Sequence, residues 1–386
     1  MATNKNDKTL NVPHLRFPEF SGEWYSYPLT DFMSFKNGMN PDAKRFGRGI
    51  KFISVMDILN NQFICYDNIR ASVEVIEGDI ETYGVNYGDI LFQRSSETLE
   101  DVGQANVYLD RKPAVFGGFV IRGKSKGNYH PVFFRYLLAS PTARKRIIVK
   151  GAGAQHFNIG QDGLSRVCLN IPSIQEQEKI AKLFECVDTR IATQNKIIEK
   201  YESLIKGIAQ HCIKESTSGN TYVKLGDICQ ITTGKLDANE QVDNGIYPFF
   251  TCAEQPFKID SFAFDTEALL ISGNGANLGY INYYKGKFNA YQRTYVLDLF
   301  SENIQYIKWA LKVLLPKRIA IEKSSSNTPY IVLSTLSDLR LPIPNKSNQC
   351  HIAKLMQSLE RKLSSQIALN GSYNKLKQYL LRQMFI

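Results

Sequence analysis

The sequence lacks the cysteine and histidine patterns that would indicate a metal centre or a disulfide framework. Its seven cysteines are an odd number, lie far apart and include no C-x-x-C pair, and the five histidines form no H-x-x-x-H pair. We therefore expect reduced, mostly buried thiols and no metal site. No nucleophile–base pair stands out either, so no catalytic residue is predicted.

Long apolar runs are also missing. No stretch approaches the roughly 18 apolar residues of a membrane span, and the opening MATNKNDKTLNVPHLRFPEF has no apolar signal-peptide core. We therefore expect a cytoplasmic protein with no membrane partner. The 386 residues, 43% of them hydrophobic and 22% charged, are typical of folded domains and too many for one domain of about 100–200 residues.

Acidic residues are the minority of the charged side chains. The chain has 47 Lys and Arg against 37 Asp and Glu, a net charge of +10. Such an excess favours a polyanionic partner, because cations that neutralise phosphates release condensed counterions. Charge alone also fits an ordinary basic protein.

What the sequence does contain is a long internal repeat. The segment LNIPSIQEQEKIAKLFECVDTRIATQNKIIEKYESLIKGIAQHCI begins at Leu169, and a related segment begins 172 residues later at Leu341. Identical residues recur at this offset without a gap: Pro172 and Pro344, Gln177 and Gln349, Ile180–Leu183 and Ile352–Leu355, Tyr201 and Tyr373. Chance does not explain an ungapped match of this length.

Each copy of the repeat has the spacing of a coiled-coil seam, alternating three and four residues. The predicted seam residues are Val187, Ile191, Gln194, Ile198, Tyr201, Leu359, Leu363, Gln366, Asn370 and Tyr373. A duplicated unit with a short connection is most simply closed by a pseudo-two-fold axis. We therefore expect two long antiparallel helices in which Gln194 meets Gln366, Val187 approaches Tyr373, and Tyr201 approaches Leu359.

The segments ahead of the two helices repeat more faintly. LTDFMSFKNG resembles LGDICQITTG, and VGQANVYLDRKPAVFGGFVI aligns without a gap with LGYINYYKGKFNAYQRTYVL. The second alignment pairs Gly103 with Gly279, Asn106 with Asn282, Tyr108 with Tyr284, Ala114 with Ala290, and Val120 with Val296. Both segments carry strand-like runs broken by turn residues.

These patterns predict an α+β fold class: two α/β globules separated by two long antiparallel coiled-coil helices with pseudo-two-fold symmetry. The expected divisions are a flexible N-terminal tail (1–12), a first globule (13–172), a first helix (173–215), a linker (216–220), a second globule (221–344) and a second helix (345–386).

The opening LRFPEFSGEW, the element LNIPSIQEQEKIAKLFECVDTRI and the globule–helix duplication together resemble the specificity subunits of type I restriction–modification systems, over residues 13–386. One departure from the family pattern is that Asn348 replaces the acidic residue kept in the first copy. This puts an ion pair at that point in question for the second half.

The resemblance implies that each globule is a target recognition domain reading one half of a bipartite site in double-stranded DNA. The helices would set the gap between the halves and dock methyltransferase subunits. It implies a non-catalytic chain without a cofactor, joined to two modification subunits (adenine-N6 methyltransferases) and two restriction subunits (translocases and nucleases). S-adenosylmethionine, ATP and Mg²⁺ are then expected in those partners.

Side chains that can reach base edges or phosphates are the candidates for DNA contact. In the first globule they are Lys44, Arg45, Arg48, Gln93, Arg94, Ser95, Ser96, Arg144, Lys145, Arg146, Gln155 and His156. In the second they are Asn274, Asn277, Gln292, Arg293, Lys317, Arg318, Lys323, Ser325 and Asn327. The loops after GDILF and EALLI carry the most weight because they follow equivalent strands. The clusters 144–146 and 317–318 follow helix-like segments and also fit basic helix ends.

Two other functions remain open. GNGANLG and NTPY resemble a cofactor turn and the catalytic tetrapeptide of an adenine-N6 methyltransferase, but Thr328 stands in place of one of the two consecutive prolines that this tetrapeptide normally carries. A coiled-coil scaffold without DNA function would explain the helices but not two basic globules. Salt-dependent binding to duplex DNA separates these alternatives.

Overall fold

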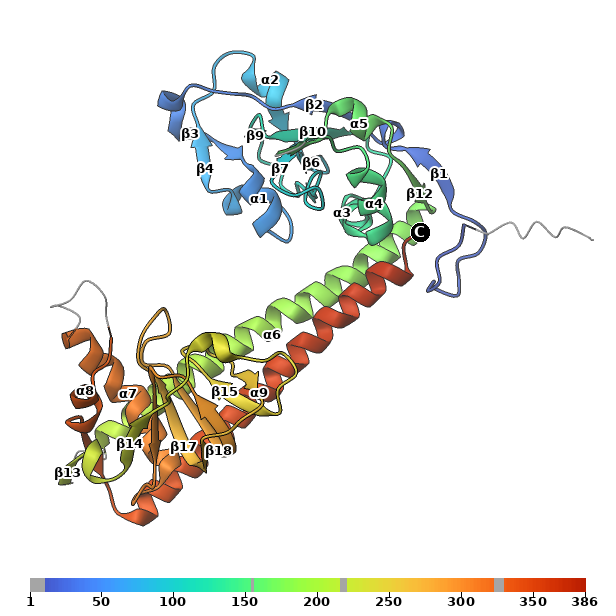
Figure 1. Cartoon of the computed structure of the whole chain (residues 1–386). Coiled ribbons are helices and arrows are strands. Elements are labelled where there is room, and N and C mark those ends of the chain that lie inside the picture. The colour runs from blue at the N-terminus through green and yellow to red at the C-terminus, as the bar shows by residue number, and fades with distance from the viewer. Residues whose placement is uncertain (1–10, 154–155, 216–220, 323–329) are drawn as a thin grey trace, which may run out of the picture. The chain divides into compact units, whose positions relative to one another are not determined.

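The computed structural model describes residues 11–153, 156–215, 221–322 and 330–386, and the chain divides into two compact units. The first unit comprises Met1–Thr193 and Leu369–Ile386, and the second comprises Gln194–Ala368. The long helices α6 (Ile174–Glu215) and α9 (Lys346–Gln383), green and red in Figure 1, each contribute residues to both units. Residues 1–10 of the expected tail and the linker 216–220 lie outside the described residues.

The first unit is a mixed α/β globule. Its strands are β1 (Tyr25–Pro28), β2 (Met33–Asn37), β3 (Phe46–Ile53), β4 (Ala71–Val73), β5 (Gly84–Val85), β6 (Ile90–Gln93), β7 (Ser95–Ser96), β8 (Ala105–Val107), β9 (Ala114–Phe116), β10 (Val120–Ser125), β11 (Phe157–Asn158) and β12 (Cys168–Ile171). Its short helices are α1 (Val55–Asn60), α2 (Asp79–Tyr83), α3 (Pro131–Ala139), α4 (Pro141–Ile148) and α5 (Gln161–Ser165), with 3-10 turns η1 (Leu29–Asp31), η2 (Ala43–Arg45) and η3 (Tyr66–Asn68).

The second unit has fewer, longer elements. Its strands are β13 (Thr221–Lys224), β14 (Gln230–Thr233), β15 (Tyr247–Phe250), β16 (Phe257–Ile259), β17 (Phe264–Ser272), β18 (Ile281–Ala290), β19 (Thr294–Asp298) and β20 (Arg340–Ile343). Its helices are α7 (Ile304–Glu322) and α8 (Leu333–Ser337), with 3-10 turns η4 (Leu225–Asp227) and η5 (Ala238–Glu240).

Both units are built on one sheet plan. The central sheet of the first unit has the order β2-β10-β6-β8, and the six-stranded sheet of the second begins with the matching order β14-β19-β17-β18. The small sheets β1-β12 and β13-β20 also match, because Tyr25 pairs with Ile171 and Thr221 with Ile343. The repeat seen in the sequence is therefore a repeat of structure.

The ungapped alignment of the segments before the helices is only partly right. Asn106 and Asn282 do occupy equivalent places, opposite Leu91 and Leu270. Further on the alignment is wrong by two residues. Gly38 N–H donates to the carbonyl of Val120 at 3.2 Å, and Gly234 N–H donates to that of Thr294 at 3.2 Å.

The hydrogen bonds therefore make Thr294, not Val296, the counterpart of Val120. By the same two-residue shift Ala290 corresponds to Phe116 and not to Ala114, since Gly117 N–H and Tyr291 N–H donate to Ile53 and Phe250 in the same way. The shift arises because the chain leaves the sheet between β8 and β9, whereas β18 continues through the equivalent stretch as one strand.

The core of the first unit is rich in aromatic rings and includes the end of α9. Phe385 packs against Phe184 and Phe133, both with ring centroids at 5.6 Å, and against Trp24 at 6.4 Å. The second unit has its own core, centred on the buried side chains Leu269, Tyr306, Leu311, Leu336 and Leu341. Burying apolar surface in each unit stabilises it separately.

Within each unit the two long helices run antiparallel. In the second unit Gln194 Nε2 donates to Gln366 Oε1 at 2.7 Å, which is the contact expected from the repeat. In the first unit Lys377 pairs with Asp188 at 2.7 Å. Each of the predicted seam residues is buried or half-buried. The approaches of Val187 to Tyr373 and of Tyr201 to Leu359 stay predictions.

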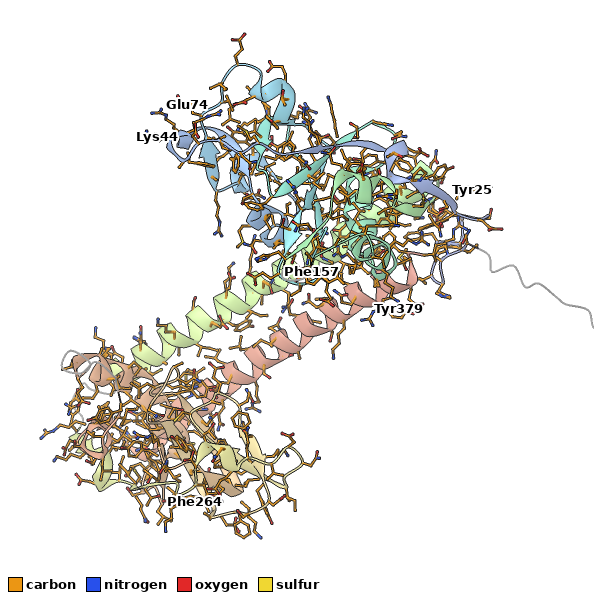
Figure 2. All side chains as sticks on the ribbon, turned by 45° about the horizontal axis from the view of Figure 1, so that its top comes forward. Tyr25, Lys44, Glu74, Phe157, Phe264 and Tyr379 are labelled. Carbon is orange, nitrogen blue, oxygen red and sulfur yellow. The ribbon has the colours of Figure 1, made fainter. Side chains whose placement is uncertain are left out.

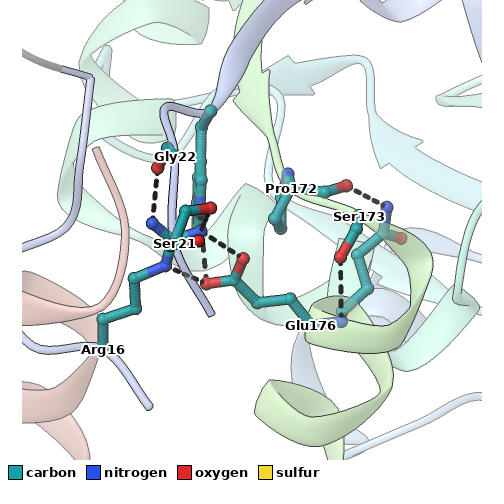
Figure 3. A network of polar contacts seen from close by, with 8 residues as sticks. Arg16, Ser21, Gly22, Pro172, Ser173 and Glu176 are labelled. Carbon is teal, nitrogen blue, oxygen red and sulfur yellow. Dashed lines mark hydrogen bonds and ion pairs between the residues drawn. The ribbon is translucent and has the colours of Figure 1, made fainter. Parts of the chain in front are cut away.

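The segment before β1 is anchored to the start of α6 by a buried ion pair (Figure 3). Arg16 donates from Nε and Nη2 to the two carboxylate oxygens of Glu176 at 2.8 and 2.7 Å, and Trp24 Nε1 donates to Oε1 at 3.3 Å. The repeat counterpart Asn348 is an exposed residue whose backbone N–H donates to Asn345. The acidic residue that the second copy lacks thus makes an ion pair that belongs to the first unit.

The cysteine side chains are more exposed than the sequence predicted. The thiols are not mostly buried: Cys168 and Cys186 are exposed and the other five cysteines are partly exposed. This expectation was wrong: Cys229 packs against the core of the second unit, but none of the seven thiols is fully enclosed by a core. Among the described residues, no helix combines the length and apolar character needed to cross a membrane.

Candidate nucleic-acid interface

Three segments of the first unit meet where β6 ends, and we call this surface the first tip: residues 94–96, 117–119 and 156–158. Arg94 N–H donates to the carbonyl of Phe119 at 2.9 Å, and the Arg94 carbonyl accepts from Ile159 N–H at 2.9 Å. Ser95 and Ser96 in β7 pair with β11. The backbone ladder thus holds Arg94 between two neighbouring segments.

The polar side chains of the first tip are partly tied to one another. Gln93 is buried, and its Nε2 donates to the carbonyl of Ser95 at 2.9 Å. The hydroxyl of Ser95 donates to Asn158 Oδ1, and Ser96 Oγ accepts a hydrogen bond from Thr98 N–H at 3.3 Å. His156 is exposed. Asn158 was not selected from the sequence, because nothing local marks it as the partner of a serine 63 residues away.

The equivalent surface of the second unit lies where β17 ends, and we call it the second tip: residues 273–277, 292–293 and 330–331. Gly273 N–H donates to the carbonyl of Arg293 at 2.9 Å, and the Gly273 carbonyl accepts from Ile331 N–H at 2.9 Å. These are the same two bonds that Arg94 makes with Phe119 and Ile159. Gly273 therefore stands at the position of Arg94, and Arg293 at that of Phe119.

Side chains of the second tip surround a hollow of about 430 Å³ lined in part by Gln292, Arg293 and Tyr330. Gln292 and Arg293 are exposed. Asn274 and Asn277 are half-buried and both contact Cys252, at 3.0 Å in each case. The two asparagines thus brace the loop, while Gln292 and Arg293 are open to a ligand.

A separate group of candidate cations lies on the first unit near the start of β3. Arg45 pairs with Asp79 and also donates from Nε to the carbonyl of Glu74 at 2.9 Å. The N–H of Ile76, together with Arg45, holds the pKa of Asp79 below its ordinary value despite some desolvation. Arg48 pairs with Glu74 at 2.7 Å. Lys44 is exposed at the same edge of the unit as Glu74 (Figure 2).

The helix-end clusters make mostly structural contacts. Arg144 Nη2 donates to the carbonyls of Glu100 and Val102 at 2.8 and 2.7 Å, and burial lowers the pKa of its guanidinium. Arg146 Nη1 donates to the carbonyl of Cys168 at 2.9 Å, and Lys145 is exposed. These bonds favour the helix-end interpretation for Arg144 and Arg146.

In the second unit, Arg318 pairs with Glu322 on the same helix at 2.7 Å. Lys317 is exposed and lines a groove beside Trp309 on α7. Four candidates, Gln155, Lys323, Ser325 and Asn327, lie outside the described residues. The best-placed groups are therefore those of the two tips.

The Gly-rich segment 273–279 does not have the setting of a cofactor turn. It follows β17 and leads into β18, and these two strands pair antiparallel. A dinucleotide-type turn instead joins a strand to a helix, whose N-terminus binds the phosphates. The local architecture therefore argues against the methyltransferase alternative.

Comparison with known proteins agrees with the duplicated plan. A profile of the family described as "Type I restriction modification DNA specificity domain" matches residues 21–203 and 217–370. The type I restriction enzyme EcoDI specificity subunit of Escherichia coli is 41% identical over 143 residues, 37% of this chain and 32% of that protein. The putative type I restriction enzyme MjaX specificity subunit of Methanocaldococcus jannaschii is 23% identical over 229 residues, 58% of this chain and 53% of that protein.

The matched regions thus span only 32% and 53% of the length of these two curated relatives. Among solved structures, the S subunit of a type I restriction–modification system from M. genitalium has a TM-score of 0.62 at 18% identity, covering 97% of this chain and 99% of that one. A chain from a structure on complex assembly and conformational transition of a type I R-M system has a TM-score of 0.58 at 14% identity, covering 93% and 96%. These likenesses show a shared fold, and the two profile matches show that the chain belongs to the family of type I restriction–modification DNA specificity domains.

Proposed function

We propose that this chain is the DNA sequence-recognition subunit of a type I restriction–modification complex. Each unit reads one half of a bipartite duplex target through its tip, and the chain itself performs no catalysis. The observation that carries this proposal is the pair of tips: one backbone arrangement presents Arg94 and Phe119 in the first unit but Gly273 and Arg293 in the second. Equivalent scaffolds with different side chains are what two different half-sites require.

The charge of the chain supports a DNA partner. The net charge is +10, and exposed Arg293 and Gln292 lie together at the second tip. An arginine can donate two hydrogen bonds to guanine O6 and N7, and a glutamine can serve adenine in the same way. We propose that these side chains contact base edges, while exposed lysines such as Lys44 and Lys145 contact phosphates.

The long helices support docking of modification subunits. Leu204 on α6 and Leu376 on α9 occupy the same position of the repeat and are 49% and 45% exposed. Apolar side chains exposed on long helices, outside the seam, are available to a protein partner. Each unit therefore offers one such place, which supports two copies of the methyltransferase.

We further propose that two restriction subunits complete the complex in the cytoplasm, where its DNA substrate lies. S-adenosylmethionine, ATP and Mg²⁺ then belong to the partner subunits. The helices also set the unspecified gap of the target in this proposal. A coiled-coil scaffold without DNA function remains the second candidate, because the helices alone fit it.

The deciding experiment is methylation sequencing of DNA from cells that express this chain with a modification subunit. We expect adenine methylation at a single bipartite motif that is absent when this chain is omitted. Binding of the purified assembly to that motif should weaken steeply as salt rises. Methylation without a motif, or none at all, would favour the scaffold.

A further inference from the structure

Phe119 is an aromatic side chain held out into solvent at the first tip. It is 69% exposed, while its own carbonyl is tied to Arg94 N–H at 2.9 Å. Its counterpart in the second unit is the exposed Arg293. The two units therefore project side chains of opposite character from one backbone position.

The turn that carries Phe119 is rigid. Val120 N–H donates to the carbonyl of Gly117 at 2.9 Å, and Arg94 Nη1 donates to the carbonyl of Gly118 at 3.2 Å. A Cβ added at Gly117 would lie 2.7 Å from the ring of Phe52, and one at Gly118 would lie 2.0 Å from Asn40 Oδ1. A side chain at either glycine would therefore displace Phe52 or Asn40, so the two glycines keep the present packing next to Phe119.

An apolar hollow of about 420 Å³ lies against the same turn, lined in part by Met39, Phe52 and Met56. Phe119 borders this hollow yet keeps most of its ring exposed. Hydrogen-bonding groups of the tip lie at the same turn: Ser95 also lines the hollow, and Arg94 contacts Gly118. An apolar ring on a rigid turn among polar groups has the arrangement of a wedge that enters a stack of base pairs.

We propose that Phe119 inserts between adjacent base pairs of the half-site read by the first unit and partly unstacks them. This inference rests on the proposed function and names how one half of the target is read. The first unit then gains specificity from steps that unstack easily, such as TA and CA, because the cost of the deformation depends on the sequence. The second unit, with Arg293 at the equivalent position, reads its half by hydrogen bonds without a wedge.

The test uses the assembly with the modification subunit and duplexes of the target found by methylation sequencing, with 2-aminopurine placed at successive steps. For the wild-type chain we expect increased fluorescence at one step of a single half-site, because an unstacked probe is brighter. Phe119→Ala should lose this signal and weaken binding about tenfold or more, while Phe119→Leu should keep part of both. Tyr25→Ala is the control: Tyr25 is 67% exposed in the same unit, on β1.

Two results overturn the wedge while leaving the proposed function standing. One is a wild-type chain that binds its target with no fluorescence increase at any step. The other is a Phe119→Ala variant that keeps the fluorescence signal. If its affinity still falls, and if replacing thymine by deoxyuridine lowers the affinity of the wild-type chain equally, the ring only touches a thymine methyl group. Failure of the wild-type chain to bind the methylated motif at all would overturn the proposed function instead. Far-ultraviolet circular dichroism establishes that the variants are folded.

Discussion

Glu176 illustrates how one residue of the repeat has acquired a different task in each unit. Its carboxylate is 2% exposed and accepts three hydrogen bonds, two from Arg16 and one from Trp24. The counterpart Asn348 is exposed, and the described hydrogen bonds involve its backbone N–H but not its side chain. The acidic residue is thus needed where the segment before β1 packs against α6.

We predict that Glu176→Ala destabilises the first unit strongly. Removing the carboxylate leaves Arg16, whose side chain is 12% exposed, without its partner, and breaking a buried ion pair costs about 3–5 kcal/mol. Asn348→Ala, the same position of the repeat, should change the free energy of unfolding by less than about 0.5 kcal/mol. Urea unfolding followed by fluorescence measures both. Equal effects would mean that the ion pair adds no stability.

The equivalent helices α3 and α7 also differ between the two units, in the residue that caps their first turn. His130 precedes α3, and its Nδ1 accepts from Phe133 N–H at 3.3 Å. Asn303 precedes α7, and its Oδ1 accepts from Gln305 and Tyr306 N–H at 3.0 and 3.1 Å. The cap of α3 is a titratable imidazole, whereas the cap of α7 is an amide that carries no charge at any pH.

We predict that the first unit loses stability as the pH falls below 6.5. Burial lowers the pKa of His130 from its ordinary 6.5, against the attraction of Glu185 and Glu178. The unfolded chain therefore takes up a proton at a higher pH than the folded one, so stability is present above 6.5 and declines as the pH falls through the folded pKa. His130→Asn copies the cap of Asn303 and should flatten this dependence.

The measurement is urea unfolding of wild type and His130→Asn at about pH 8 and about pH 5.5. The difference between the two proteins isolates the histidine from other titrating groups. An equal loss of stability in both would show that His130 contributes nothing to the pH dependence.

The sequence predicted the long elements better than the short ones. Each long helix was recognisable because its seam repeats along some forty residues, and Gln194 met Gln366 as expected. The strands were aligned wrongly around Val120, because a change in loop length between strands leaves no local signal. Helix periodicity is a long-range pattern, and strand register is set by partners elsewhere in the chain.

The candidate site, like the fold, was predicted only in part from the sequence. Residues after the strands ending at Gln93 and Ser272 do lie at equivalent tips. Phe119 was not predicted, because base edges are read mainly by hydrogen-bonding side chains, although two glycines before an aromatic residue were a signal. Arg144 was selected by charge, and its carbonyl partners come from residues 100 and 102, which no local pattern relates to it.

At the scale of the whole molecule, both long helices contain residues of each compact unit. We predict that four residues inserted into both helices at equivalent repeat positions lengthen the unspecified gap of the target, since one helical turn adds about 5.4 Å. The two half-sites should stay the same. Methylation sequencing reads out the motif, and a variant with four exposed helix residues changed to alanine at the same place is the control. An unchanged gap would show that the helices do not set it.

The duplication also makes a prediction about independence, because each unit closes its own hydrophobic core. Arg94→Ala should weaken recognition of one half-site only, and Arg293→Ala that of the other only. The loss should be about 1–3 kcal/mol where the guanidinium contacts guanine. A phosphate contact would instead lower affinity for all sequences and reduce the salt slope by about one.

The two arginines should also differ in kind. Arg94 Nη1 already donates to Gly118, so Arg94→Ala should loosen the turn that carries Phe119 and reduce the discrimination of base steps. Arg293 is exposed beside the second hollow, so Arg293→Ala should remove a direct contact, and Arg293→Lys should not restore it, because lysine lacks the bidentate geometry. Competition binding with duplexes altered in one half at a time distinguishes the effects. If either single variant relaxed both halves equally, the two units would form one composite reading surface and would not act independently.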